Sequence, residues 1–476
     1  MRNLLILLII VVLGFSARLY KIDNPVADWH SWRQGDTASV TRNMVDSGIN
    51  LLYPRYHDLS LLQTGKDNPE GYRLVEVPIF NAIHATLYKA YPAFSLEKWG
   101  RLLSAIVSTV SIVFMYLLGK KYLGAVGGLL SAFLFAFLPF NIYFSRVILP
   151  DPMCVTLSLA FLWFYTEWLN KKSIQYLVLS GVLFSLALLV KPYAIFFAIP
   201  ATWLTFKEYG KSMWNKKELY IFGALSFLPL ILWRFHIARY PEGIPFYKWM
   251  FNMEGIRFKP AFWRWIFGER IGRMILGLWG LVPFAIGAVA KSKDKEKYFP
   301  LAMFAGAFAY LSILAAANVR HDYYQTLIIP GVVFVTAKGA IELWNNTSFN
   351  KWFARFLVVA SILFALGFSW YDIKELYKIN HPEIVEAGNA LQKFAPYDAK
   401  VLAPYHGDTA LLYQTKRNGW PEMTYAVGKH LEMGAKYFVS VNLEHPDTLD
   451  IERKYITLEK TDKYIIIKLE PKPRTP

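Results

Sequence analysis

The chain has 476 residues and is poor in charge, since 55% of it is hydrophobic, 17% aromatic and only 18% charged. Soluble domains carry about 25% charged residues, so this composition excludes a disordered chain, a collagen and an ordinary cytosolic globule, and it favours a multi-pass membrane protein. The formal net charge is +17, and the whole surplus lies in residues 1–371, because residues 372–476 hold equal numbers of acidic and basic side chains. Lys and Arg within a hydrophobic region indicate anchoring of membrane loops, and nucleic acid is not expected as a partner.

Eleven apolar stretches are candidate membrane spans, since a helix needs about 20 apolar residues to cross the hydrocarbon. They cover residues 4–20, 101–118, 123–140, 153–169, 174–190, 193–206, 219–235, 272–290, 299–316, 325–343 and 354–371. The first stretch has a second interpretation as a signal peptide, although no clean small-residue cleavage site follows Phe15.

Lysines mark alternate connections between these stretches and set the expected orientation. They occur at Lys120–Lys121, at Lys171–Lys172, at residues 207–217 and at Lys291, Lys293, Lys295 and Lys297. The positive-inside rule places these connections in the cytoplasm, together with the N-terminus. Segments 21–100, 141–152, 236–271 and 317–324 then share the outer face of a plasma or inner membrane, and the C-terminal tail lies outside as well.

The tail predicts a small extracytoplasmic α/β domain over residues 372–476, after a mainly helical membrane domain over residues 1–371. A helical pattern covers 382–394, and strand patterns cover 400–403, 436–441, 455–458 and 464–469. No glycine-rich nucleotide fingerprint is found there, which favours a cap or recruitment domain over a catalytic one. Cys154 is the only cysteine, so the chain forms no intrachain disulfide and no cysteine-based zinc site.

The first outer segment carries the acidic candidates. Asp36 opens a helical pattern over residues 36–47, so it is expected at or near the N-cap, where a carboxylate either caps the helix or acts as a general base. Asp28 lies a little earlier in the same segment. Glu76 lies in an apolar stretch, where a carboxylate needs a partner. Its alternatives are an ion pair with an Arg of the same segment and binding of a substrate hydroxyl.

The other outer segments carry the cationic candidates. Arg146 and Asp151 share one short turn and form either an ion pair or part of a site. Lys191 precedes Pro192 on the face that is poor in lysine, so it is either an anion ligand or a side chain that reaches to the interface. Segment 236–271 is basic and aromatic, typical of an amphipathic segment lying in the interface. Its Arg257 and Lys259 either anchor it or clamp a lipid phosphate.

A run of polar residues at 318–325 lies between two apolar stretches and favours a site, with Arg320, His321 and Tyr324 as its candidates. His30, His57 and His321 have no spacing typical of metal ligands, so no metal is expected.

The order of these motifs resembles the GT-C superfamily of membrane glycosyltransferases, over roughly residues 1–371. The most similar branch is glycosyltransferase family 39, the bacterial dolichyl-phosphate-mannose-protein mannosyltransferase-like proteins related to aminoarabinose transferases. The match is carried by Trp32-Arg-Gln-Gly-Asp36-Thr-Ala with Arg42-Asn-Met44, Glu76-Val-Pro78, Ser145-Arg146 with Asp151, Lys191-Pro192 and Arg320-His-Asp-Tyr-Tyr324.

The resemblance implies transfer of a sugar from a polyprenyl-phosphate donor to an acceptor on the non-cytoplasmic face, without a cofactor. A first-segment carboxylate deprotonates the acceptor, and a single displacement inverts the sugar. Asp36 is the first choice for this base, Asp28 competes with it, and Glu76 is the third acidic candidate. The departing phosphate anion is stabilised by nearby cations. The candidates for binding are Arg33, Arg146, Lys191, Arg257, Lys259, Arg320, His321 and Tyr324.

Two positions depart from the family pattern. Relatives often carry Asp-Glu where this chain has Arg33-Gln34, which leaves the register of the base open between Asp36 and Asp28. Aminoarabinose transferases place a Lys before the proline that matches Pro78, and this chain has Val77 there. Phosphate binding is therefore expected from the other cations.

Two other classes of protein remain as alternatives. A transporter or flippase for a lipid-linked or anionic solute would want charged or broken segments near the bilayer midplane and an internal repeat, and the sequence shows neither. A non-catalytic assembly factor would tolerate replacement of every acidic residue in the first outer segment. The sugar, the acceptor and the oligomeric state are not set by the sequence.

Overall fold

A computed structural model describes residues 1–291, 298–347 and 350–473 of the chain. Its contacts divide the chain into two compact units, unit 1 (Met1–Ile22, Arg101–Arg234 and Tyr247–Leu376) and unit 2 (Asp23–Gly100, Phe235–Phe246 and Tyr377–Pro476). Lys293, Lys295 and Lys297 of the expected cytoplasmic connection lie outside the described residues.

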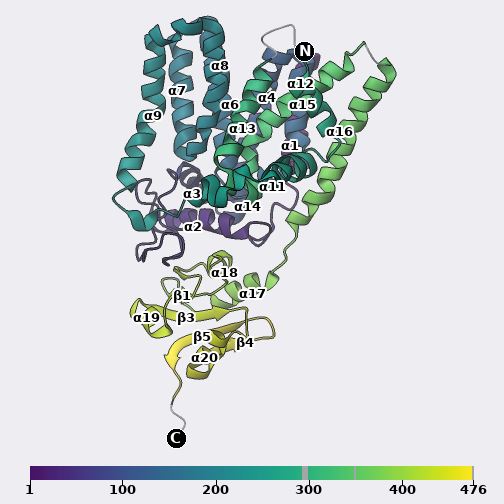
Figure 1. The fold of residues 1–476 in the computed structure, drawn as a ribbon. Coiled ribbons are helices and arrows are strands. Elements are labelled where there is room, and N and C mark those ends of the chain that lie inside the picture. The colour runs from purple at the N-terminus through teal and green to yellow at the C-terminus, as the bar shows by residue number, and fades with distance from the viewer. Residues whose placement is uncertain (292–297, 348–349, 474–476) are drawn as a thin grey trace. The chain divides into compact units, whose positions relative to one another are not determined.

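Unit 1 is built from helices, most of which run side by side (Figure 1). In chain order they are α1 (Arg2–Arg18), α4 (Leu96–Phe137), α5 (Pro139–Phe144), α6 (Asp151–Lys171), α7 (Ile174–Val190), α8 (Ala198–Tyr209), α9 (Lys217–Ile237), α10 (Trp249–Asn252), α11 (Pro260–Arg264), α12 (Leu281–Val289), α13 (Phe299–Ile313), α14 (Ala315–Arg320), α15 (Ile329–Trp344) and α16 (Lys351–Ile373). Irregular helical turns precede or link several of them, at η1 (Pro192–Phe197), η2 (Gly210–Asn215), η4 (Met253–Phe258), η5 (Trp265–Ile275), η7 (Asp322–Ile328) and η8 (Lys374–Tyr377).

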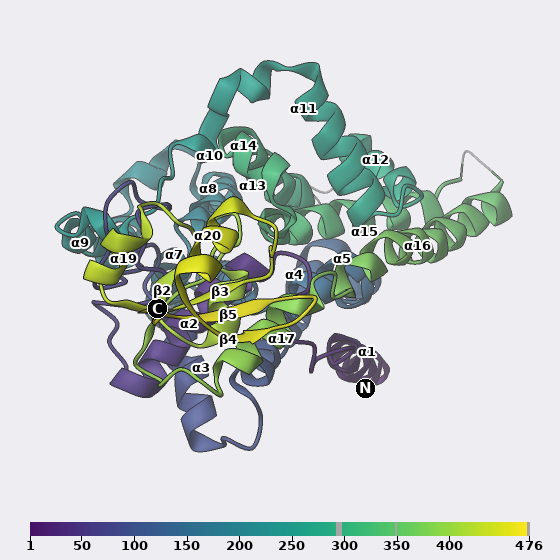
Figure 2. The ribbon, with the colours of Figure 1, turned by 90° about the horizontal axis from the view of Figure 1, so that it is seen from below.

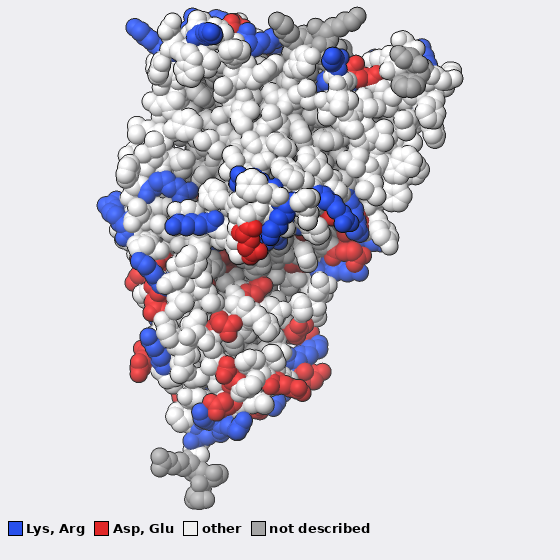
Figure 3. Space-filling view, viewed as in Figure 1, with Lys and Arg blue, Asp and Glu red and all other residues white. Residues whose placement is uncertain are grey.

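Four helical stretches of the described chain are long and apolar enough to cross a membrane, by length and composition. They are Leu96–Phe137, Lys217–Ile237, Asp322–Trp344 and Lys351–Leu391, and the shorter apolar helices Ile174–Val190 and Phe299–Ile313 come next. Figure 3 shows a broad belt with few charged side chains over the helices of unit 1, with Lys and Arg at its borders. These features are typical of a helical membrane domain.

The expected count of eleven spans is not confirmed. Stretch 101–118 and most of stretch 123–140 lie in α4, where two helices are joined across the non-helical backbone of Gly124. Stretch 272–290 is instead broken, because Gly277 and Leu278 have positive φ and only Leu281–Val289 continues as a helix. Hydropathy measures apolar length and does not detect such a break.

Helices α12 and α15 of unit 1 approach each other closely at two glycines. A Cβ on Gly339 would lie 1.8 Å from the carbonyl oxygen of Pro283, and a Cβ on Gly287 would lie 2.0 Å from that of Val335. Small residues permit this backbone contact, which is a usual way to pack helices in a membrane.

Unit 2 combines the first outer segment with the C-terminal tail. Its helices are α2 (Ser31–Ser47), α3 (Ile79–Ala90), α17 (Pro382–Leu391), α18 (Ala410–Thr415), α19 (Val427–Glu432) and α20 (Pro446–Lys454), with a short turn η3 (Pro241–Gly243). Its strands are β1 (Lys400–Leu402), β2 (Gly419–Trp420), β3 (Ala435–Ser440), β4 (Tyr455–Lys460) and β5 (Ile465–Pro471). The four strands and the helix expected in the tail are confirmed, and the two-residue strand β2 is an addition.

The five strands form one sheet in the order β2-β1-β3-β5-β4 (Figure 2). Strands β1, β2 and β3 are parallel, and β5 is antiparallel to both β3 and β4. Alternate residues of the strands face two apolar cores, as expected for a sheet covered on both faces. Val401 packs with α17 and α18 on one face, whereas Leu402 packs with α20 on the other.

Candidate active site

Helix α2 of unit 2 places Asp36 in a buried position. The helix begins at Ser31, with His30 as its N-cap, so the expectation of Asp36 at or near the N-cap is wrong. The helix includes Arg33 and Gln34, which are both good helix formers. The sequence analysis did not use them and therefore expected the helix to begin too late. Asp36 is only 1% exposed and lies one turn further in, where its carboxylate is available to other segments of the unit.

Three side chains of unit 2 hold the Asp36 carboxylate. Thr409 Oγ1 donates to Oδ1 at 2.8 Å, Gln63 Nε2 donates to Oδ2 at 3.2 Å, and Arg73 Nη2 lies 3.2 Å from Oδ2. Arg73 also donates to Gln63, so the two donors are fixed relative to each other. A carboxylate offers about four acceptor positions, and Oδ1 can therefore accept one further hydrogen bond. The carboxylate is oriented without being saturated.

The other acidic candidates are paired locally. Gln34 Nε2 donates to Asp28 Oδ1 at 2.7 Å, and Asp28 is 3% exposed. Arg33 Nη2 lies 2.8 Å from Glu76 Oε1. The ion pair between Glu76 and an Arg of its own segment, one of the two alternatives for this residue, is therefore confirmed.

Two more carboxylates of unit 2 lie within electrostatic reach of Asp36. Burial raises the pKa of Asp58 to about 7, with the Asp36 charge adding to the shift while hydrogen bonds from Ser60 oppose it. Burial likewise raises the pKa of Asp408 to about 6, again with a contribution from Asp36. Sequence analysis missed Asp408 and Thr409. Their position shortly after the strand pattern 400–403 could have identified them, because polar site residues gather at the carboxyl ends of parallel strands.

A second buried network connects α2 with α18. Arg42 Nη2 lies 2.8 Å from Glu97 Oε1 and donates to Tyr413 Oη at 3.0 Å, while Tyr413 Oη donates to Glu97 at 2.6 Å. The ring of Tyr413 also lies parallel to that of His57, whose pKa is lowered well below its usual value by burial and by nearby arginines. This network fixes α2 against the tail within unit 2.

Unit 1 holds a buried ion pair between Lys191 and Asp151. Asp151 is the first residue of α6 and Lys191 follows the last residue of α7, so these two adjacent helices bring the side chains together. Lys191 Nζ lies 2.7 Å from Asp151 Oδ1, and the two side chains are 6% and 0% exposed. The expected alternative pair of Arg146 with Asp151 is replaced, because Asp151 takes Lys191 and Arg146 donates to the carbonyl oxygen of Lys21. Lys191 does not reach to the interface, because burial and its partner hold it inside.

Aromatic rings continue this cluster of unit 1 toward exposed cations. Lys191 Nζ lies 5.5 and 5.3 Å from the ring centroids of Tyr323 and Tyr324. His321 stacks on Tyr323 and meets Trp249 edge-on, and the Arg320 guanidinium lies 5.4 Å from the Trp249 ring.

Cations of unit 1 differ in whether a carboxylate offsets them. Arg257 donates to the carbonyl oxygen of Ile313, Arg320 contacts Met253, and Lys259 is exposed. Within the described residues none of these three is in an ion pair, whereas Lys191 pairs with Asp151 and Arg270 with Asp322. Arg257, Lys259 and Arg320 therefore carry positive charge that no carboxylate of the described residues offsets.

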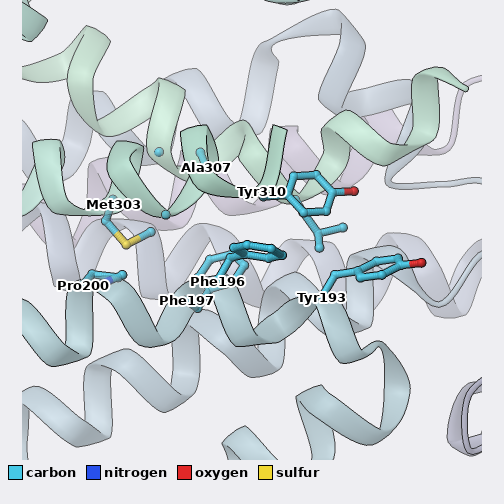
Figure 4. Close-up of a pocket in the computed structure, with 10 residues that line it drawn as sticks. Tyr193, Phe196, Phe197, Pro200, Met303, Ala307 and Tyr310 are labelled. Carbon is cyan, nitrogen blue, oxygen red and sulfur yellow. The ribbon is translucent and has the colours of Figure 1, made fainter. Parts of the chain in front are cut away.

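An apolar seam lies beside Tyr324, whose ring centroid is 6.1 Å from that of Tyr193 in the wall of the seam. Figure 4 shows the residues that line it. Tyr193, Phe197 and Pro200 line it from η1 and α8, and Met303 and Tyr310 line it from α13. Its free volume is only about 10 Å³, about the space of one water, so it is closed. The described residues contain no group of three or more His, Cys, Asp or Glu placed to hold a metal ion.

Comparison with known proteins gives matches by family model and by structure. Residues 93–233 match the family model described as dolichyl-phosphate-mannose-protein mannosyltransferase. No curated protein sequence matches the chain. The crystal structure of ArnT from Cupriavidus metallidurans bound to undecaprenyl phosphate is similar with a TM-score of 0.66 and 12% identity, over 98% of this chain and 99% of that one.

The chain shares the fold of this ArnT structure.

A second solved structure has a similar fold. The archaeal oligosaccharyltransferase AglB from Archaeoglobus fulgidus, in complex with an inhibitory peptide and a dolichol-phosphate, is similar with a TM-score of 0.60 and 12% identity, over 96% of this chain and 72% of that one. The expected resemblance to GT-C proteins of the mannosyltransferase-like and ArnT-like kind is confirmed. The four helical stretches that are long and apolar enough to cross a membrane support a membrane protein.

Proposed function

We propose that this protein transfers a sugar from a polyprenyl-phosphate donor to an acceptor on the non-cytoplasmic face of the membrane. One structural observation carries the proposal. Three cations without a carboxylate partner, Arg257, Lys259 and Arg320, lie in unit 1 on segments that pack together and are rich in exposed aromatic side chains. Such a surface suits a phosphate that is attached to an apolar chain. The likeness to structures bound to undecaprenyl phosphate and to a dolichol-phosphate supports a polyprenyl-phosphate donor.

In this proposal the uncompensated cations bind the donor phosphate. Arg320 and Arg257 present planar guanidinium groups that match phosphate oxygens, and Lys259 adds a point charge. Lys191 contributes less net charge because Asp151 offsets it, and the pair instead fixes Tyr323 and Tyr324. His321 extends the polar side of the surface, and its ring centroid lies 6.2 Å from that of the buried Tyr324. Arg33 and Arg146 serve mainly to hold neighbouring segments.

The acceptor is deprotonated by a carboxylate of unit 2, for which we propose Asp36. The acceptor oxygen gives its proton to Asp36 and forms a bond to the anomeric carbon. The bond from that carbon to the phosphate oxygen breaks at the same time, and polyprenyl phosphate leaves with the electron pair. A single displacement of this kind inverts the anomeric configuration. The oriented, unsaturated carboxylate of Asp36 favours it over Asp28, and Glu76 is tied to Arg33.

Replacement of the acidic residues tests this assignment. Asp36→Asn keeps the shape and most hydrogen bonds of the side chain but cannot take a proton. We expect turnover of a polyprenyl-phosphate sugar by the purified full chain in lipid to fall about a hundredfold or more, the usual size of a general-base contribution. Glu70→Gln is the matched control, because Glu70 lies in the same segment and is about half exposed in a surface ion pair with Arg55.

The outcomes separate the candidates for the base. Loss of turnover in Asp28→Asn with normal turnover in Asp36→Asn would move the role to Asp28. Normal turnover in both variants would exclude both aspartates as the base. Thermal unfolding of each variant is measured alongside, so that loss of activity is not confused with loss of the fold.

A further inference from the structure

Unit 2 contains a cleft whose lining includes none of the candidate active-site residues. It has a volume of about 630 Å³ and lies where β1 and β3 end. The loop after β1 contributes Tyr405 and His406, and the loop after β3 contributes Asn442, Glu444 and His445.

The topology of the sheet explains why a cleft forms there. From β1 the chain passes through α18 to β2 on one side of the sheet order, whereas from β3 it passes through α20 toward β4 on the other side. Helix α18 packs on one face of the sheet and α20 on the opposite face. The two loops therefore separate at a switch point, which is where open sheets of parallel strands bind their ligands.

The side chains of the cleft select against an anion. Among the described residues that line it there is no Lys or Arg, and five carboxylates contribute to it, from Glu383, Glu422, Glu444, Asp447 and Asp462. Two of its histidines lie beside carboxylates, since His381 Nδ1 is 2.8 Å from Glu383 and His445 Nδ1 is 3.6 Å from Asp447. The amino end of α20 would suit an anion, but Asp447 already lies in its first turn.

The same side chains fit a ligand rich in hydroxyl groups. Carboxylates and the Asn442 amide accept hydrogen bonds from hydroxyls, and imidazole nitrogens can both donate and accept. The ring of Tyr405 is half-buried in the wall and offers an apolar face of the kind that packs against a flat ligand. Sugar rings without phosphate, sulfate or carboxylate groups combine these features.

We propose that this cleft binds a saccharide without anionic groups, and that this saccharide is part of the acceptor. The second clause rests on the glycosyl transfer proposed above. The loop that forms the cleft wall at Tyr405 continues to Thr409, which donates to Asp36 Oδ1 at 2.8 Å. One short loop of unit 2 thus both lines the cleft and holds the carboxylate proposed as the base.

Ligand binding to the full chain in lipid nanodiscs tests the cleft. Saturation-transfer NMR is run with a panel of short neutral oligosaccharides built from glucose, mannose, galactose or N-acetylglucosamine, and with a sulfated oligosaccharide of similar length. We expect transfer to at least one neutral member and none to the sulfated probe. Transfer to no neutral member, or equal transfer to the sulfated probe, would overturn the proposal.

Substitution then assigns the binding to the cleft. Asn442→Ala combined with Glu444→Gln removes an amide and a charge from two exposed side chains that make no hydrogen bond or ion pair with the other described residues. We expect about tenfold weaker binding, the effect of losing one charged hydrogen bond or two neutral ones. Glu432→Gln, on α19 and outside the lining, is the matched control and should bind as the unmodified chain does. Unchanged affinity in the double variant would overturn the assignment.

Glycosyl transfer by the unmodified chain is measured separately with a polyprenyl-phosphate sugar. Saccharide binding without any transfer would contradict the proposed function and leave the cleft as a saccharide site. Glycosyl transfer without saccharide binding would contradict only the proposal that the cleft binds a saccharide. The two proposals therefore fail independently.

Discussion

Each unit holds a buried ion pair, and this limits what a single substitution can reveal. Asp151 is paired with Lys191 in unit 1, and Asp36 is paired with Arg73 in unit 2. Removing one member of such a pair leaves an uncompensated charge inside and costs about 3–5 kcal/mol. A lost activity in Lys191→Met would therefore not distinguish phosphate binding from support of the fold. Asp36→Asn likewise leaves Arg73 without its partner charge, which is why thermal unfolding of that variant is measured together with its turnover.

Asp58 of unit 2 is the residue whose titration should affect stability most clearly. Its pKa is about 7 in the folded protein against 3.8 as the ordinary value, chiefly because of burial. Between these values the folded state keeps a proton that the unfolded state releases, so the stabilising contribution is complete below about pH 4 and is lost as pH rises through about 7. The shift corresponds to roughly 4 kcal/mol.

Asp58→Asn removes this dependence. We expect the variant to gain thermal stability relative to the unmodified chain when pH is raised from 5 to 8, because Asn carries no charge to bury. The buried neutral histidines His57 and His84 act in the opposite direction, but they are present in both proteins and cancel in the comparison. Asp398→Asn, at an exposed position, should show no such change with pH. A constant difference between Asp58→Asn and the unmodified chain would contradict the assignment.

At the scale of elements, the sequence predicted those whose signal is local. Strands β1, β3, β4 and β5 coincide with the strand patterns of the tail. Helix α7 covers the apolar stretch 174–190 without a break. The start of α2 was missed because its first turn is polar and has no side-chain cap. The pairing of Lys191 with Asp151, 40 residues apart, was missed because it depends on how α6 and α7 pack. Sequence periodicity carries no information on such contacts.

Close packing of α12 on α15 gives the prediction that belongs to this scale. Gly339→Ala places a Cβ 1.8 Å from the Pro283 carbonyl oxygen, a backbone atom that cannot move aside without displacing the helix. We expect a loss of about 2 kcal/mol or more, in the range for overpacking, seen as a lower unfolding temperature in detergent. Gly367→Ala on α16 is the control, since nothing lies within 4 Å of its Cβ and alanine favours the helix. Equal stability of the two variants would show that the helices are not in contact there.

At the scale of the whole molecule, composition identified the class of protein but not its division into units. The surplus of positive charge and the apolar stretches are properties of segments, and they predicted a membrane protein. The association of residues 23–100 with residues 377–476 in unit 2 depends instead on contacts such as Thr409 with Asp36. Hydrogen bonds between residues this far apart in the sequence do not affect the hydropathy or charge pattern. The C-terminal domain expected after residue 371 was therefore predicted without the first outer segment.

Orientation in the membrane is the property of the whole chain that the lysine pattern predicts, and the single cysteine makes it measurable. Cys154 is fully buried, so a cysteine introduced at an exposed position is the reactive one. We expect Lys393→Cys, in the tail, to react with a membrane-impermeant maleimide on intact cells whose plasma membrane is accessible. Lys211→Cys, in an expected cytoplasmic connection, should react only after permeabilisation. The unmodified chain controls for Cys154. Reaction of Lys211→Cys on intact cells would show the opposite orientation, with the lysine-rich connections outside. That result would contradict the positive-inside rule for this chain, since positively charged loops are normally retained in the cytoplasm during insertion.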